Sequence, residues 1–164
     1  MTGWTSSGPV FMVVNPESFA CPASPDRGYV FDYCTTGYYG IGRAGTESIS
    51  QTIDISNLAS DISSGLVNIN LSAYAIKWLS ASDATIKLEL LNGSDTVLDT
   101  YSQSVTTGSC WQALTIDQNS IDPDTTTLRI TLSATISNES PAIDYIEFDG
   151  VSLILTKSES EINI

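Results

Sequence analysis

The sequence predicts an all-β protein that folds as an antiparallel β-sandwich of the jelly-roll type. Three observations support this fold class. Apolar residues recur at every second position in several short runs, turn-forming residues separate those runs, and the spacing that marks an amphipathic helix is nearly absent. Alternation of this kind is typical of a strand that packs one face on a core and turns the other face to solvent.

The clearest strands are the runs "GLVNINLSA" (65–73), "TIKLELL" (85–91) and "TTLRITLSAT" (126–135). Further strands are expected at 8–14, 28–33, 47–55, 96–104, 111–116 and 144–156. The apolar positions of the strands predict a core between two sheets. The residues expected to be mostly buried are Val67, Ile69, Leu71, Ile86, Leu88, Leu90, Leu128, Ile130, Leu132, Val151 and Leu153.

Turns and the single helical segment complete the expected architecture. Asn92-Gly93 lies between two alternating runs and predicts a hairpin. Residues 55–65 are expected to hold one short helical turn, with Ser56 or Asn57 as N-cap and Gly65 as its stop. Residues 1–156 are expected to form a single domain, and the polar tail 157–164 either frays or adds a strand.

The charge balance excludes several classes of function. Six Lys and Arg stand against 19 Asp and Glu, which gives a formal net charge of −13. Nucleic acids and anionic membranes attract clustered cations, so neither is expected as a partner. The chain has no His, so a Ser–His or Cys–His catalytic arrangement is impossible within it, and we expect no enzyme. No apolar segment is long enough to predict a membrane span.

The three cysteines, Cys21, Cys34 and Cys110, allow at most one internal disulfide. Cys21 and Cys34 are close in sequence, whereas Cys34 and Cys110 meet only if the fold brings their loops together. Three reduced thiols are the remaining alternative, and the sequence does not decide among these.

Several stretches follow one another in a familiar order. They are "GWTSSGPVFMV" (3–13), "GYVFDYC" (28–34), "SISQTIDIS" (48–56), "VNINLSAYAIKWLS" (67–80), "ATIKLELLNGSDTVL" (84–98), "SCWQALTI" (109–116) and "YIEFDGVSLIL" (145–155). In this order the chain resembles the galactose-binding-domain-like jelly rolls, a superfamily that includes many carbohydrate-binding modules and the F-box-associated sugar-binding domains. Members commonly begin with an extra strand before the Trp, but only three residues precede Trp4 here. That first strand is either missing or supplied from elsewhere.

The resemblance also implies a calcium site at the closing strand. Asp149 stands where many modules of the superfamily place a calcium-ligating Asp, and Glu147 shares its face under strict alternation. Asp144 lies in the preceding loop. The alternative is that Asp149 accepts hydrogen bonds from loop backbone N–H groups and that Glu147 is solvated. The missing first strand often contributes to this site in the superfamily, which counts against Ca²⁺.

One candidate ligand platform is the strand 66–79. Its polar face begins with Asn68, Asn70 and Ser72 and continues with Tyr74, Ile76 and Trp78. Aromatic rings at the end of a polar strand face can stack on sugar rings. The alternative is that a loop covers Tyr74 and Trp78 and makes them part of the core.

A second candidate is the loop 35–43, "TTGYYGIGR". Tyr38, Tyr39 and Arg43 combine stacking and hydrogen-bonding groups in a Gly-rich segment, although the tyrosines could equally pack on the rim of the sandwich. Arg129 and Lys87 are expected on exposed strand faces, where they could donate to sugar hydroxyls.

Two functions follow from these features. The first is a non-catalytic, extracellular or cell-surface carbohydrate-binding module whose partner is a glycan. The second is a structural subunit of an extracellular filament or appendage, assembled from copies of itself through an open sheet edge or the C-terminal tail. "EINI" in that tail alternates like a strand, so Ile162 and Ile164 are expected to contact a sheet in the same chain or in an adjacent subunit.

Overall fold

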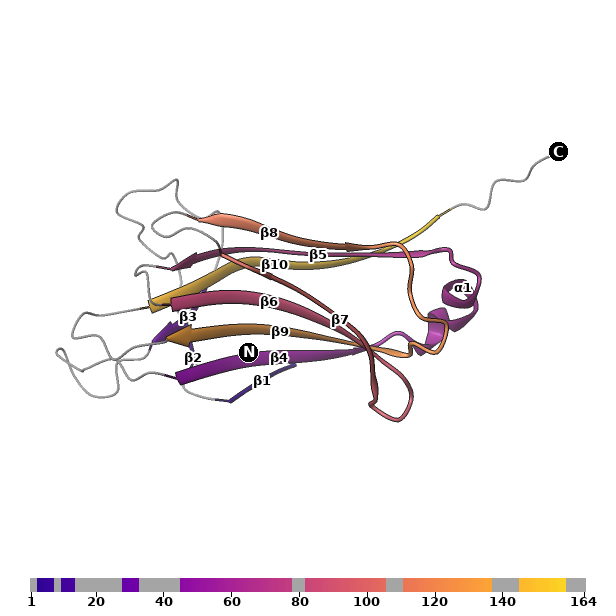
Figure 1. The fold of residues 1–164 in the computed structure, drawn as a ribbon, viewed down its shortest axis with the longest axis horizontal. Coiled ribbons are helices and arrows are strands. Elements are labelled where there is room, and N and C mark those ends of the chain that lie inside the picture. The colour runs from indigo at the N-terminus through magenta and orange to yellow at the C-terminus, as the bar shows by residue number, and fades with distance from the viewer. Residues whose placement is uncertain are drawn as a thin grey trace.

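The computed structural model describes residues 3–7, 10–13, 28–32, 45–77, 82–105, 111–136 and 145–158, and these form two antiparallel five-stranded sheets (Figure 1). Sheet A has the order β1 (Trp4–Ser6), β4 (Gly45–Asp54), β9 (Thr127–Ile136), β6 (Ser82–Leu91) and β7 (Val97–Ser104). Sheet B has the order β2 (Val10–Val13), β3 (Gly28–Asp32), β10 (Tyr145–Lys157), β5 (Val67–Lys77) and β8 (Gln112–Gln118). The predicted antiparallel β-sandwich is confirmed.

The core lies between the two sheets, where their apolar faces meet. Nine of the eleven residues expected there are at most 4% exposed, because alternation turns one side of each strand inward. They are Val67, Ile69, Leu71, Ile86, Leu88, Leu90, Leu128, Ile130 and Leu132. The other two, Val151 and Leu153, pack against this core but are only partly buried.

A β-bulge in β10 explains why the closing strand departs from strict alternation. Asp149 pairs with Tyr74 of β5, but the next pair is Ser152 with Ser72, so two residues of β10 oppose one residue of β5. Gly150 in the bulge has φ 57°, a left-handed conformation that glycine adopts without strain. Phe148 before the bulge and Leu153 after it therefore both face the core, which unbroken alternation would forbid.

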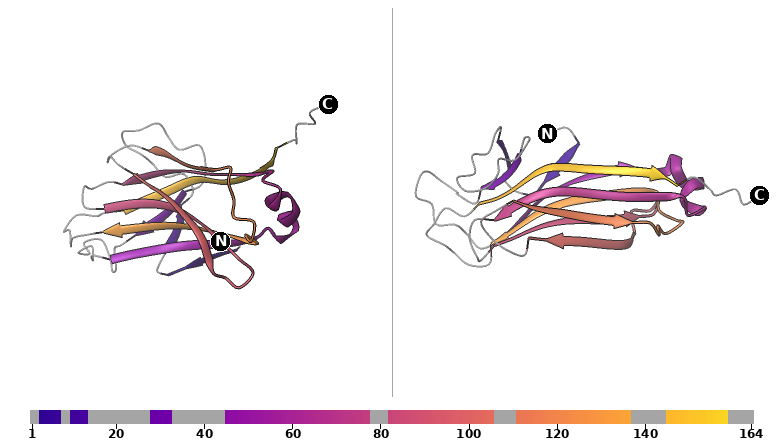
Figure 2. Two further views of the ribbon diagram at one scale, coloured as in Figure 1. Left: turned by 45° about the vertical axis from the view of Figure 1, so that its right-hand side comes forward. Right: turned by 90° about the horizontal axis from the view of Figure 1, so that it is seen from above.

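One short helical segment connects β4 to β5 at one end of the sandwich (Figure 2). It consists of the 3-10 turn η1 (Ser56–Leu58) and the helix α1 (Ala59–Ser63), and Gly65 follows it with φ 68°, as the sequence predicted. The predicted side-chain cap is wrong, because neither N-cap position makes a side-chain cap bond. Asp54 takes that role instead: its Oδ1 accepts from Ser56 N (2.8 Å), and this bond lowers the pKa of Asp54.

The predicted hairpin joins β6 to β7, and Asn92 organises it. The Oδ1 of Asn92 accepts hydrogen bonds from the backbone N–H groups of Ser94 (2.9 Å) and Thr96 (3.0 Å). The left-handed residue of the loop is Asp95, with φ 59°, rather than Gly93. Asp tolerates this conformation better than most residues do, so the turn needs no glycine at that point.

One edge strand of sheet A, β1, was not among the expected strands, and the expectation that a strand before Trp4 is missing stays a prediction. The chain's own β1 pairs with β4 at one edge of sheet A. On the other side of the sandwich, β7 and β8 are the edge strands, and the Oε1 of Gln103 in β7 accepts a hydrogen bond from Thr115 N in β8 (2.6 Å). A side chain of sheet A thus satisfies a backbone group of sheet B.

The C-terminal strand extends to Lys157, and Ser158 N donates to Leu66 O (2.8 Å). Ile162 and Ile164 lie beyond the described residues, so their contacts stay a prediction. Cys21, Cys34 and Cys110 also fall in stretches that the structure does not describe, and their pairing stays open. No helix in the described part of the chain is long and apolar enough to cross a membrane.

Candidate functional site

The candidate site is the side of sheet B that faces away from the core, across β10, β5 and β8. We call it outer face B. The register aligns its side chains in rows across the three strands, because residues paired between antiparallel strands point to the same side. Asn70 lies between Ile154 and Asp117, Ser72 lies between Ser152 and Thr115, and Tyr74 lies beside Ala113.

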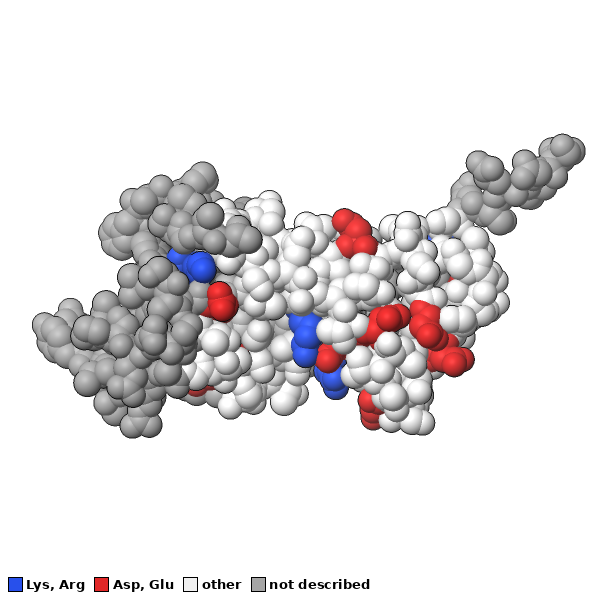
Figure 3. All heavy atoms as spheres, in the orientation of Figure 1, with Lys and Arg blue, Asp and Glu red and all other residues white. Residues whose placement is uncertain are grey.

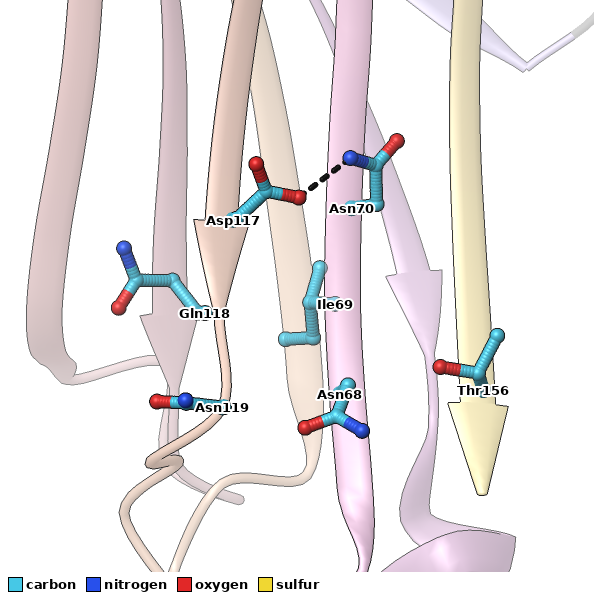
Figure 4. A pocket seen from close by; sticks show the side chains of 7 residues that line it. All are labelled: Asn68, Ile69, Asn70, Asp117, Gln118, Asn119 and Thr156. Atoms are coloured by element: carbon cyan, nitrogen blue, oxygen red, sulfur yellow. Dashed lines mark hydrogen bonds between the residues drawn. The ribbon is translucent and has the colours of Figure 1, made fainter. Parts of the chain in front are cut away.

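A polar pocket of about 310 Å³ lies at the α1 end of outer face B (Figure 4). Its walls come from β5, from β8 and the residue after it, and from the end of β10. The lining residues are Asn68, Ile69, Asn70, Asp117, Gln118, Asn119 and Thr156. Amides, a hydroxyl and one carboxylate therefore converge on a small volume, and none of the described residues that line it is Lys or Arg.

Two hydrogen bonds fix the amides of the pocket. Asn70 Nδ2 donates to Asp117 Oδ1 (2.5 Å), as Figure 4 shows. Asn68 Nδ2 donates to Ser158 Oγ (2.8 Å), which ties β5 to the residue that follows β10. In both side chains the amide nitrogen is directed to the protein, so the amide oxygens are available to a ligand.

Tyr74 supplies an aromatic surface further along the same strand. Its neighbours Ala73 and Ala75 are buried, but Tyr74 itself is 44% exposed, so it is not a core residue. Its ring lies against the bulge of β10: a Cβ built on Gly150 would come within 3.3 Å of Tyr74 Cδ2. The glycine therefore lets the ring rest on the backbone of the bulge, which holds it in place with much of its surface accessible.

Two further apolar residues lie near Tyr74 on the outer side of sheet B, although neither is fully exposed. Ile76, the next residue of the same alternation, is fully buried although it lies outside the core cluster. Trp111 immediately precedes β8, and continuing the alternation back from Ala113 puts it on the outer side. Trp111 is half-buried, and its indole Nε1 is buried without a hydrogen-bond partner. In the sequence, "SCWQALTI" predicts a strand, but nothing in it marks Trp111 as a site residue.

Asp149 is completely buried, and its Oδ1 accepts a hydrogen bond from Gly150 N (2.7 Å). This contact is of the type expected if Asp149 accepts hydrogen bonds from backbone N–H groups and does not bind calcium. The register keeps positions 147 and 149 on one side of β10, since they pair with Ile76 and Tyr74. Within the described residues no three His, Cys, Asp or Glu side chains cluster as metal ligands. Asp144 and the side chain of Glu147 are not described, so calcium stays a prediction.

The structure does not bring Arg129 together with Tyr74. Arg129 lies on β9, on the side of sheet A that faces away from sheet B, which we call outer face A. Its Nε donates to Glu89 Oε2 (2.7 Å), and Lys87 Nζ lies 3.1 Å from Glu89 Oε1. The bond from Arg129 lowers the pKa of Glu89, and Lys87 adds to this effect against the opposing effect of burial. The remaining predicted site residues, Tyr38, Tyr39, Arg43 and Trp78, lie outside the described ranges.

The electrostatics of the surface follow the composition. On the view in Figure 3, acidic side chains gather towards the α1 end. The Lys and Arg residues within the described part of the chain each lie within 4 Å of a carboxylate: Lys77 near Asp83, Lys87 and Arg129 at Glu89, and Lys157 at Asp61. None of these cations compensates Asp117.

Comparison with known proteins shows the fold. No protein-family model matches the chain, and no curated protein matches its sequence. Among solved structures it is similar to the enzymatically active domain of tailspike protein 4 of bacteriophage CBA120 (TM-score 0.63, 13% identity), with 94% of this chain matching 20% of that chain.

Two further structures match over nearly their whole length. TmCBM61, solved in complex with β-1,4-galactotriose, has a TM-score of 0.59 and 15% identity, and the match covers 96% of this chain and 90% of that one. The CBM22-1 xylan-binding domain of Xyn10C from Paenibacillus barcinonensis has a TM-score of 0.50 and 18% identity, and the match covers 96% and 88%. The chain thus has the β-sandwich fold of carbohydrate-binding modules, as its resemblance to the galactose-binding-like jelly rolls implied.

Proposed function

We propose that this protein is a non-catalytic carbohydrate-binding module whose glycan lies along β5 on outer face B. The observation that carries the proposal is the exposed Tyr74 ring, which shares one strand face with the pocket at Asn70 and Asp117. Sugars need both features, because their ring faces are apolar and their rims carry hydroxyls. The fold supports the same function, since TmCBM61 is described with a galactotriose and the CBM22-1 domain as xylan-binding.

The spacing of these groups indicates a chain of sugars rather than one. Tyr74 and Asn70 are four residues apart on β5, which corresponds to about 13 Å along a strand. A single monosaccharide is too short to reach both. An oligosaccharide that stacks one unit on Tyr74 can place another over the pocket. The extracellular or cell-surface location stays part of the proposal.

The same residues argue for binding without catalysis. Hydrolysis of a glycosidic bond ordinarily requires two carboxyl groups that flank it. Of the residues described around the pocket, Asp117 alone carries a carboxylate. The chain has no His that could act as a general base in its place.

A glycan array followed by calorimetric titration tests the proposal. Galacto- and xylo-oligosaccharides are the first probes, each with calcium and with a chelator, so that the predicted metal is tested in the same experiment. Tyr74→Ala should weaken binding about tenfold, because stacking is lost. Tyr74→Phe keeps the ring and should stay within about threefold of the wild type. If the wild-type protein binds no glycan at millimolar concentration, the proposed function is wrong.

A further inference from the structure

We propose that the pocket around Asp117 selects neutral, hydroxyl-rich sugars and rejects sugars that carry a carboxylate or sulfate group. This inference rests on the proposed function, because it concerns the ligand of the same face. It assigns Asp117 as the residue that determines the charge specificity of the site. In the sequence, Asp117 is one polar residue in an alternating strand, and nothing there marks it as a site residue.

The hydrogen bonds of the pocket leave the Asp117 carboxylate and two amide oxygens as acceptors at its centre, beside the donor groups of Gln118, Asn119 and Thr156. Asp117 is exposed, and its Oδ1 accepts from Asn70, while its Oδ2 bonds to no described residue. Asn70 and Asn68 each direct their Nδ2 to a protein oxygen. In Figure 4 the oxygen of Asn70 points away from Asp117. A sugar hydroxyl can donate to these oxygens, and neighbouring hydroxyls of one ring can donate to both oxygens of a carboxylate.

An anionic substituent on the sugar is disfavoured next to Asp117 for two reasons. Carboxylate and sulfate groups only accept hydrogen bonds, so opposite Asp117 they would leave acceptors facing acceptors. They would also place two negative charges close together, with no Lys or Arg among the described lining residues. Lys157 is near in sequence to Thr156, but its Nζ is 2.7 Å from Asp61 Oδ1. The formal charge of −13 adds a long-range repulsion.

Matched pairs of ligands test this inference on the full-length protein. Each neutral galacto- or xylo-oligosaccharide that binds is compared with a derivative that carries one carboxylate, such as a galacto-oligosaccharide oxidised at its primary hydroxyls or a xylo-oligosaccharide substituted with a uronic acid. In the wild type the acidic form should bind at least about fivefold more weakly, the repulsion expected for two charges about 5 Å apart in a solvated site. In Asp117→Asn, which keeps the shape but removes the charge, the two forms should bind within about twofold of each other.

Asp95→Asn is the matched control. It removes one carboxylate of the same type from the β6–β7 hairpin of sheet A, at a left-handed position that Asn tolerates. This variant should keep the fivefold preference for the neutral ligand. If the wild type binds both forms equally, or if the preference survives in Asp117→Asn, the inference is wrong while the proposed function stands. If no neutral probe binds the wild type, both are wrong, and circular dichroism of each variant verifies its fold.

Discussion

The two outer faces of the sandwich are both polar, yet they use their polar groups differently. On outer face A the side chains bond to one another: Thr46 to Thr135 (2.9 Å between hydroxyl oxygens), Thr85 to Ser104 (2.7 Å), and Arg129 to Glu89. On outer face B a polar pocket opens beside exposed apolar surface, with Tyr74 44% and Ile154 51% exposed.

The difference shows why alternation alone does not reveal a binding face. Hydroxyls and charges that already satisfy one another gain little from a ligand, since each new hydrogen bond replaces an existing one. Outer face B has oxygens without a hydrogen-bond donor among the described residues next to the Tyr74 ring. A ligand can donate hydrogen bonds to these oxygens while it covers the ring. In the sequence both faces have the same pattern, which is the polar side of a half-buried strand.

The largest expected effect lies beneath both faces. Ile130 is 2% exposed in the middle of β9, between the two sheets. Ile130→Ala should lower the free energy of unfolding by about 2–5 kcal/mol, because it removes buried methyl groups and leaves a cavity. Chemical denaturation measures this change. A loss below about 0.5 kcal/mol, as at a surface position, would show that the faces of β9 are inverted.

Gly150→Ala should damage outer face B selectively. A Cβ at this left-handed position costs about 1–2 kcal/mol of stability, and it would also displace the Tyr74 ring from the bulge. Glycan affinity should therefore fall together with the Tm. Gly45→Ala is the control, because a Cβ there has no atom within 4 Å and Gly45 is not left-handed. Unchanged affinity in Gly150→Ala would mean that the position of the Tyr74 ring against the bulge does not affect glycan binding.

Glu89→Gln tests the closed polar network of outer face A. The substitution weakens the bonds to Arg129 and Lys87 and should cost about 1 kcal/mol at neutral pH. The folded-state pKa of Glu89 lies below its ordinary value of 4.5, so this stabilisation is complete above that value and is lost as the pH falls through the lower folded-state pKa. Thermal unfolding of both proteins from pH 7 to pH 2 should show two curves that converge in acid. A constant difference at every pH would contradict this assignment.

The smallest expected effect is on glycan affinity, and it tests directly which outer face binds the ligand. Arg129→Gln should leave glycan affinity within about twofold of the wild type, because Arg129 lies in sheet A and the proposed ligand lies on sheet B. Titration with the oligosaccharides that bind the wild type measures this. A loss greater than about fivefold would move the ligand to outer face A and reverse the assignment of the two faces.

Alternation predicted the core and every described strand except β1, because both depend on the side to which a residue points, whereas the hairpin followed from Asn92-Gly93 between two alternating runs. It could not predict which sheet a strand joins, and this is why Arg129 and Tyr74 were considered for the same function although they lie in different layers. The bulge was also missed, although the apolar positions change parity between Phe148 and Val151, because the break could be located only from the register against β5. Asp117 becomes conspicuous only when the register of β8 against β5 places it beside Asn70.

The hydrogen bond between Gln103 and Thr115 N has a consequence for how this protein behaves at high concentration. An edge strand can recruit a strand from another molecule only through backbone groups that are still unpaired. In β8 the N–H of Thr115 is occupied by a side chain that crosses from the opposite layer. An incoming strand would first have to displace that glutamine, so strand addition to β8 is hindered at Thr115.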